Sequence, residues 1–94
     1  MSDITTTTVT ADGVAVNHPA RVKSIYYIRG SSAGSIVLKD GGSSGTTLLT
    51  LTTPGAGSGV DAANTMASPS DGIRFSTNVF VDVTNVSSVT LFHA

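Results

Sequence analysis

Two histidines are the first candidates for acid–base chemistry, because imidazole is the side chain that titrates nearest to neutral pH. His18 precedes Pro19 in a stretch typical of a turn, and His93 lies next to the last residue of the sequence. Catalytic triads assemble in space from distant residues, so chain order alone does not exclude one. No carboxylate is spaced to orient either imidazole, however, and we expect both histidines to be packing or solvated side chains.

Two glycine-rich stretches, 40–45 and 54–59, are the next candidates, for phosphate or cation binding. Neither has the Gly-Lys-Ser/Thr ending of a phosphate-binding loop. Asp40 and Ser43 offer oxygen ligands, but their spacing is not that of a calcium-binding EF-hand. We therefore expect hairpin connections here, with no metal or cofactor. All six acidic residues are aspartates, which disfavours paired-carboxylate chemistry, and we predict no catalytic residues and a non-enzymatic protein.

The Tyr26-Tyr27 pair is a candidate platform for stacking a base or a sugar. Adjacent residues of a strand point to opposite faces, so only one of the two tyrosines can belong to a given platform. We expect one tyrosine in the core and one at the surface.

The composition indicates which elements hold these residues. With 94 residues, a net charge of −1 and 39% hydrophobic residues, the chain is long enough for one small domain, 1–94, and is too apolar for a disordered tail. A nucleic-acid binder would be strongly basic. The sequence lacks cysteine, so it forms no disulfide, and it has no apolar run of about 20 residues that could span a membrane. Its first residues do not resemble a secretory signal, so we expect synthesis in a cytoplasm.

Threonine, valine and serine dominate the sequence, and these residues favour short strands and turns over helices. We expect residues 1–10 to form an extended N-terminal arm or an edge strand, and 60–69 to form a short strand plus irregular chain. The other expected strands are 14–16, 21–29, 35–39, 46–53, 73–76, 79–83 and 88–92. This spacing predicts an all-β fold, a small antiparallel β-sandwich or barrel (jelly-roll-like) of about seven or eight short strands.

Alternation along each expected strand divides the side chains into core-facing and outward-facing sets. In 21–29 we assign Val22, Ser24, Tyr26 and Ile28 to the core. Too many large apolar residues then face outward for a solitary domain, and contiguous exposed apolar area typically marks a contact site. The alternatives are scattered surface residues or a register misread by one residue. The interface candidates are the apolar Ile25, Tyr27, Val37, Leu48, Phe80 and Phe92 and the basic Arg21, Lys23 and Arg29.

Several segments together resemble small virion structural proteins of tailed bacteriophages, especially phages of marine bacteria. They are 21–28, 33–42, 49–51, 72–75 and 83–86, and the resemblance extends from Ser2 to the end of the chain. It implies a non-enzymatic subunit present in many copies, with a capsid decoration or cement protein as the favoured role. The implied partners are the major capsid protein or other virion proteins and further copies of the chain, at the capsid surface of the virion. No nucleic acid, membrane or small-molecule substrate is implied.

Two other functions remain open at this point. One is a tail, collar or fibre-associated β-module of the virion. The other is a carbohydrate-binding module with Tyr27 and Phe80 as its platform, although only 5% of residues are aromatic and tryptophan is absent.

Overall fold

The computed structural model describes residues 4–57, 59, 61–67 and 72–94. It confirms the all-β fold class, with nine strands and no helix among these residues. The strands are β1 (Thr5–Val9), β2 (Gly13–Val16), β3 (Ala20–Arg29), β4 (Gly34–Asp40), β5 (Thr46–Thr53), β6 (Ala63–Ala67), β7 (Ile73–Phe75), β8 (Val79–Thr84) and β9 (Val86–His93). No membrane-spanning helix is found in the described part of the chain.

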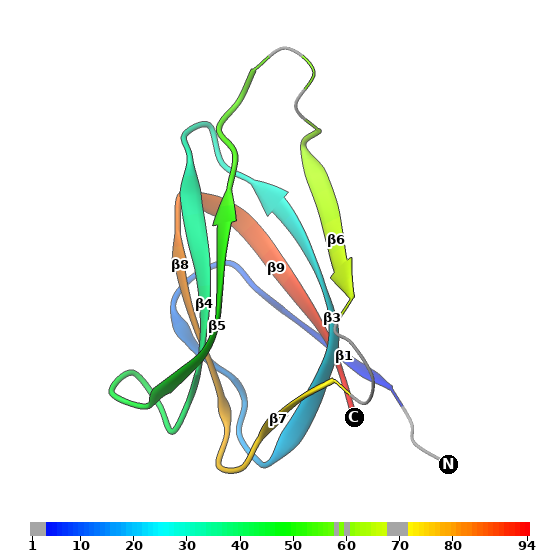
Figure 1. The fold of residues 1–94 in the computed structure, drawn as a ribbon, viewed down its shortest axis with the longest axis vertical. Coiled ribbons are helices and arrows are strands. Elements are labelled where there is room, and N and C mark those ends of the chain that lie inside the picture. The colour runs from blue at the N-terminus through cyan, green and yellow to red at the C-terminus, as the bar shows by residue number, and fades with distance from the viewer. Residues whose placement is uncertain (1–3, 58, 60, 68–71) are drawn as a thin grey trace.

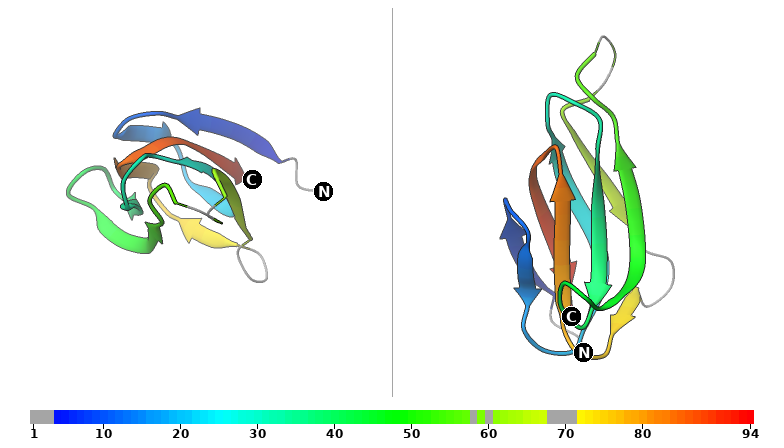
Figure 2. Two further views of the ribbon diagram at one scale, coloured as in Figure 1. Left: turned by 90° about the horizontal axis from the view of Figure 1, so that it is seen from above. Right: turned by 90° about the vertical axis from the view of Figure 1, so that its left-hand side faces the viewer.

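The strands form two antiparallel sheets that pack face to face as a sandwich (Figures 1 and 2). One sheet has the order β1-β9-β3-β6, and the short β7 also pairs with β3. The other sheet has the order β2-β8-β4-β5. Without the additional strand β7, the two sheets have four strands each, and their strand order is that of an eight-stranded jelly roll. The first four strands, β1 to β4, lie alternately in one sheet and the other.

The stretch 60–69 contributes β6, while residues 60, 68 and 69 of it lie outside the described residues. At the N-terminus, β1 pairs with β9 at the edge of the larger sheet. Residues 1–3 of the expected arm also lie outside the described residues. The additional strand β7 lies beside the first part of β3, and β6 lies beside the second part.

The core is built from the inward side chains of both sheets. Phe75 is the largest side chain that is completely buried. Burial of a side chain of this kind contributes about 1.5–3 kcal/mol, so the inward rows of the two sheets stabilise the sandwich. The other fully buried core residues are Val22, Ile25, Ile36, Leu38, Val79, Val81, Val89 and Leu91.

A β-bulge in β3 overturns part of the predicted orientation. In the pairing with β9, Val22 lies opposite His93 and Ser24 lies opposite Phe92, so Lys23 is an extra residue on β3. The bulge falls where the partner on the other edge of β3 changes from β7 to β6. A one-residue insertion moves every later side chain to the opposite face.

The assignment of Ile25 and Tyr27 to the outer face is therefore wrong. Ile25 is completely buried and Tyr27 is 8% exposed, and both belong to the core. Tyr26 and Ile28, which were assigned to the core, are exposed instead. The expectation of one core tyrosine and one surface tyrosine is correct, with the two roles exchanged.

Asn85 turns the chain from β8 directly into β9. Its φ of 53° is in the left-handed region that asparagine tolerates better than most residues. Its carbonyl oxygen accepts the N–H of Gly30 at 3.0 Å, and its side-chain amide donates to the carbonyl of Ala33 at 3.1 Å. A Cβ at Gly34 would collide with the carbonyl oxygen of Thr84, so glycine there lets the β3–β4 connection pack closely on this corner.

Candidate interaction surfaces

The outer face of the β2-β8-β4-β5 sheet carries an apolar patch. Phe80 is half-buried and lies between Val79 and Val81, both completely buried, so its side chain points away from the core. Val37 points outward for the same reason, between Ile36 and Leu38. The four-strand face, as we name this patch, consists of one residue from each strand of the sheet: Val14, Phe80, Val37 and Leu48.

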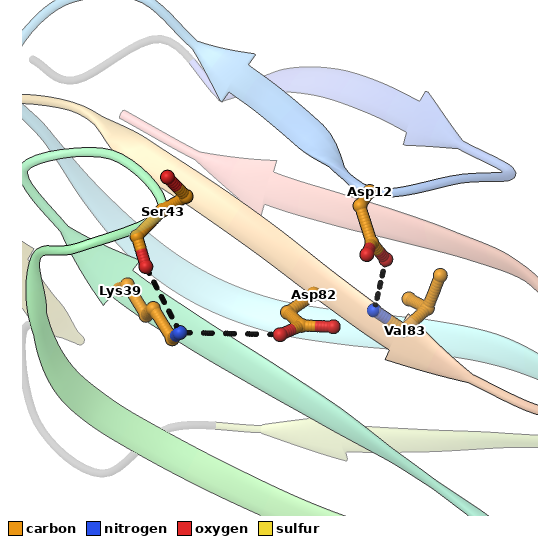
Figure 3. A network of polar contacts seen from close by, with 5 residues as sticks. All are labelled: Asp12, Lys39, Ser43, Asp82 and Val83. Atoms are coloured by element: carbon orange, nitrogen blue, oxygen red, sulfur yellow. Dashed lines mark hydrogen bonds and ion pairs between the residues drawn. The ribbon is translucent and has the colours of Figure 1, made fainter.

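Two charges on the four-strand face neutralise each other. In the register of β4 and β8, Val37 lies opposite Asp82 and Lys39 lies opposite Phe80, so each charged residue has an apolar neighbour across the strands. The Lys39 ammonium lies 3.9 Å from the Asp82 carboxylate and donates to the carbonyl of Ser43 at 3.1 Å (Figure 3). A partly exposed ion pair contributes about 0–1 kcal/mol. The larger effect of the ion pair is that its two charges cancel, so they do not repel a surface that approaches the four-strand face.

Asp12 completes the edge of this sheet. Its carboxylate accepts the backbone N–H of Val83 at 2.8 Å, next to the last residues of β8 that pair with β2 (Figure 3). A backbone donor of β8 that lies beyond the first residue of β2 is thereby satisfied by a side chain. Asp12, in the bend between β1 and β2, thereby contacts a strand that is distant in the sequence.

The outer face of the other sheet carries a second, smaller patch. Phe92 is half-buried between Leu91 and His93, which both point inward. Tyr26 and Ile28 are 38% and 37% exposed, and Tyr26 is diagonal to Phe92 across β3 and β9. The hydroxyls of Thr8 and Thr90 are hydrogen-bonded at 2.8 Å beside this patch. We name Tyr26, Ile28 and Phe92 the five-strand face.

The structure therefore places some of the predicted interface residues on one surface and places others in the core. Val37, Leu48 and Phe80 share one face, while Phe92 lies on the opposite face. Sequence reasoning missed Val14, Tyr26 and Ile28, which are among the most exposed large hydrophobic residues. The available signal was Ser24, because a polar residue in an otherwise apolar inward row indicates that the row is interrupted.

The three basic candidates do not form one surface. The Arg29 guanidinium donates to the carbonyls of Asp61 at 3.1 Å and Gly30 at 3.2 Å, which fixes it at one end of the sandwich. Arg21 lies opposite Arg74, and both line a shallow groove together with Phe75 and Ala94. Lys23 is half-buried at the bulge.

Asp40 and Asn78 join two neighbouring loops by reciprocal hydrogen bonds. The Asp40 carboxylate accepts the N–H groups of Ser76 at 3.0 Å and Thr77 at 2.9 Å and the Ser76 hydroxyl at 2.8 Å. The Asn78 side-chain oxygen accepts the N–H groups of residues 41 and 42, each at 3.1 Å. The backbone N–H of Ser76, followed by that of Thr77 and the Ser76 hydroxyl, lowers the pKa of Asp40 from 3.8 to about 2. The Asp40 oxygens considered for calcium are thus engaged in holding the two loops together.

The two histidines have different surroundings. His93 is 5% exposed, and its Nε2 lies 3.0 Å from the Thr7 hydroxyl. Burial, and then the charge of His18, lower the pKa of His93. His18 contacts the carbonyl of Pro19 through Nδ1 at 2.8 Å. Among the described residues neither imidazole is hydrogen-bonded to a carboxylate, and no three His, Cys, Asp or Glu side chains gather as a metal site.

Comparison with protein-family models, with curated proteins and with solved structures finds no match to this chain.

Proposed function

We propose that this protein is a non-enzymatic structural subunit of a bacteriophage particle, and specifically a capsid decoration subunit that braces neighbouring capsomers. The observation that carries the proposal is the four-strand face, where large apolar side chains from four strands lie outside the core. Large apolar side chains gathered on one outer face of a sheet are typical of protein contact sites. The sequence resemblance to small virion proteins is the reason for proposing a bacteriophage particle as the assembly that this face contacts.

The arrangement of the two faces suits a bracing subunit. They lie on opposite sides of a flat molecule with extents of 41, 30 and 18 Å, so that one copy can touch two neighbours at once. The net charge of −1 and the internal pairing of Lys39 with Asp82 keep electrostatic repulsion between repeated copies low. The proposed partners are the major capsid protein and further copies of this chain at the capsid surface.

The jelly-roll order of the strands is compatible with this role, since viral capsid and lectin domains share it. The fold alone does not assign a function, which depends on the surfaces that it presents. A carbohydrate platform formed by Tyr27 and Phe80 is excluded by geometry, because Tyr27 is in the core and Phe80 lies on the outer face of the other sheet.

A tail, collar or fibre module is the second candidate, supported by the same exposed apolar faces. Copy number separates the two roles. A decoration subunit should be present in amounts comparable to the major capsid protein, whereas a tail component should be a minor constituent. Quantitative mass spectrometry of purified particles measures this ratio directly.

Phe80→Asp is the sharpest test of the four-strand face. Phe80 lies outside the core, so we expect the variant to fold, with a free energy of unfolding within about 1 kcal/mol of the parent. A carboxylate at the centre of an apolar contact should reduce the number of copies bound per particle by at least about tenfold, which corresponds to about 1.4 kcal/mol.

Ser32→Asp is the matched control, because it adds the same charge at an exposed position of the β3–β4 connection, at the opposite end of β4 from Lys39. We expect it to bind particles as the parent does. Equal binding by Phe80→Asp and the parent would mean that the four-strand face is not the contact surface.

A further inference from the structure

The free edge of β5 differs from ordinary edge strands in its lack of protection. β5 is the last strand of its sheet, and Figure 2 shows it at the border of that sheet beside β4. Among the described residues, β4 alone pairs with its backbone. In an antiparallel ladder, residues alternate in directing their N–H and C=O groups toward each neighbour, so about half of those of β5 point outward.

Native edge strands are usually protected by lysine, proline, strong bulges or short length. β5 has the sequence Thr-Thr-Leu-Leu-Thr-Leu-Thr-Thr over 46–53, with no charged residue and no proline. Its one bulge lies at its beginning, between Thr47 and Leu49, and the pairing from Leu49 to Thr53 is regular. By comparison, the edge strand β1 is shorter and consists of four threonines and one valine.

We propose that β5 is a self-association edge, through which two copies of this chain form one continuous antiparallel sheet. A two-fold axis that relates such strands must be perpendicular to the sheet, so core-facing residues can only lie opposite core-facing residues. Leu49 and Leu51 both pack against the core. A register centred on Thr50 places Leu49 opposite Leu51 of the second copy, and Thr50 opposite Thr50.

This register is self-complementary on both faces of the sheet. On the core side, leucine meets leucine twice. On the outer side, the central threonines meet each other, and Thr52 of the second copy lies next to Leu48, the 39% exposed residue of the bulge. Cross-strand apolar and threonine pairs of this kind are the favourable units of a sheet.

The inference deepens the proposed function, because it names the surface through which copies would contact one another. The inference rests on the proposed function only where it assigns the dimer a role in a particle, because the pairing of two copies depends on β5 alone. The test uses the purified chain without any particle, so a failure here leaves the four-strand face as the capsid contact, and a failure at the capsid leaves this pairing unaffected.

Disulfide trapping tests the register, because the chain has no cysteine of its own. Directly opposite residues of an antiparallel pair have Cα atoms about 4.5–5.5 Å apart, within the range of about 4.4–6.8 Å that a disulfide spans. Under oxidised glutathione, Thr50→Cys should form covalent dimers at least about tenfold faster than an unpaired surface cysteine, because pairing raises the local thiol concentration.

Two control variants carry the cysteine elsewhere. Thr6→Cys is an exposed threonine on the other threonine-rich edge, β1. Thr52→Cys lies on β5 itself, but in the proposed register the two copies of this position are separated by four residues, about 13 Å. Dimers of either control that form as fast as those of Thr50→Cys would overturn the proposal.

Sedimentation velocity supplies the second measurement. We expect the parent to show a concentration-dependent dimer and Thr50→Lys, which sets two ammonium groups opposite each other, to be monomeric with an unchanged melting temperature. A parent that stays monomeric at millimolar concentration would overturn the proposal.

Discussion

Asp40 is the residue with the most distinctive surroundings in this molecule. An aspartate in a glycine-rich loop suggests cation chemistry, yet its oxygens accept hydrogen bonds from three successive residues, Ser76, Thr77 and Asn78. Asn78 returns the interaction by accepting from the Asp40 loop. The two loops at this end of the sandwich therefore behave as one unit, in which aspartate and asparagine serve structure.

Asp40 should make folding stability sensitive to acid. Its pKa is lowered in the folded state, so its contribution is complete above about pH 4 and is lost as the pH falls toward 2. Asp40→Asn should therefore lower the melting temperature at pH 7, and its difference from the parent should shrink between pH 4 and pH 2. Thermal unfolding followed by circular dichroism across this range measures the difference.

Asp61→Asn is the control for this prediction, because it removes the same charge from an exposed position. Its difference from the parent should not change with pH in the same way. His93, whose pKa is lowered, weakens folding below about pH 6.5 in all of these proteins alike, so its effect cancels in the differences. A difference between Asp40→Asn and the parent that stays constant down to pH 2 would contradict the assigned role.

At the scale of the elements, β3 determines which residues the surface presents. It is the central strand of its sheet, and the extra residue Lys23 exchanges the inward and outward rows in the middle of the strand. The first part of the strand places Val22 in the core, and the second part places Ile25 and Tyr27 there. Without the bulge, Tyr26 and Ile28 would be core residues and the five-strand face would be different.

Alanine substitution distinguishes the two orientations of β3. Ile25→Ala should destabilise the protein by about 2–5 kcal/mol, since it opens a cavity in the core. Ile28→Ala removes the same side-chain atoms from an exposed position and should change stability by less than about 1 kcal/mol. Urea unfolding of the two variants gives both values. If Ile28→Ala were the more destabilising variant, β3 would have the uninterrupted alternation predicted from sequence, and the bulge would be contradicted.

The bulge also shows why sequence predicted some elements better than others. For β5 the predicted bounds, 46–53, agree with the structure, and the alternation over 79–83 in β8 is correct, because polar residues or turn signals fix the period there. In the second part of β3 both possible rows are apolar, Ile25 with Tyr27 or Tyr26 with Ile28, so the pattern there cannot choose between them. The bulge coincides with the change of partner from β7 to β6, a long-range feature that sequence spacing does not give, and Ser24 is the local sign that the row is interrupted.

The candidate surfaces were predictable to the same extent. Val37 and Phe80 lie on strands with a clear period and point outward as expected, and Leu48, at the bulge of β5, is exposed as expected. That they share one sheet with Val14 depends on the strand order β2-β8-β4-β5. Strand order follows from the packing of the whole sandwich, and sequence spacing alone does not give it.

At the scale of the whole molecule, the three proposed contact surfaces point in different directions. The four-strand and five-strand faces lie on opposite sides of the sandwich, and the edge of β5 lies between them. A subunit with this geometry can link to a copy of itself edge to edge and still offer a face to the particle. This combination is what a bracing subunit in a symmetric shell requires.

The most direct test of this account is an image reconstruction of the whole particle by electron cryomicroscopy, at a resolution that places individual strands. We predict density for the sandwich on the outside of the capsid, repeated over the shell, with Val14, Val37, Leu48 and Phe80 packed against a neighbouring subunit. Density confined to the tail, or a sandwich on the capsid whose four-strand face is turned to solvent, would contradict the account.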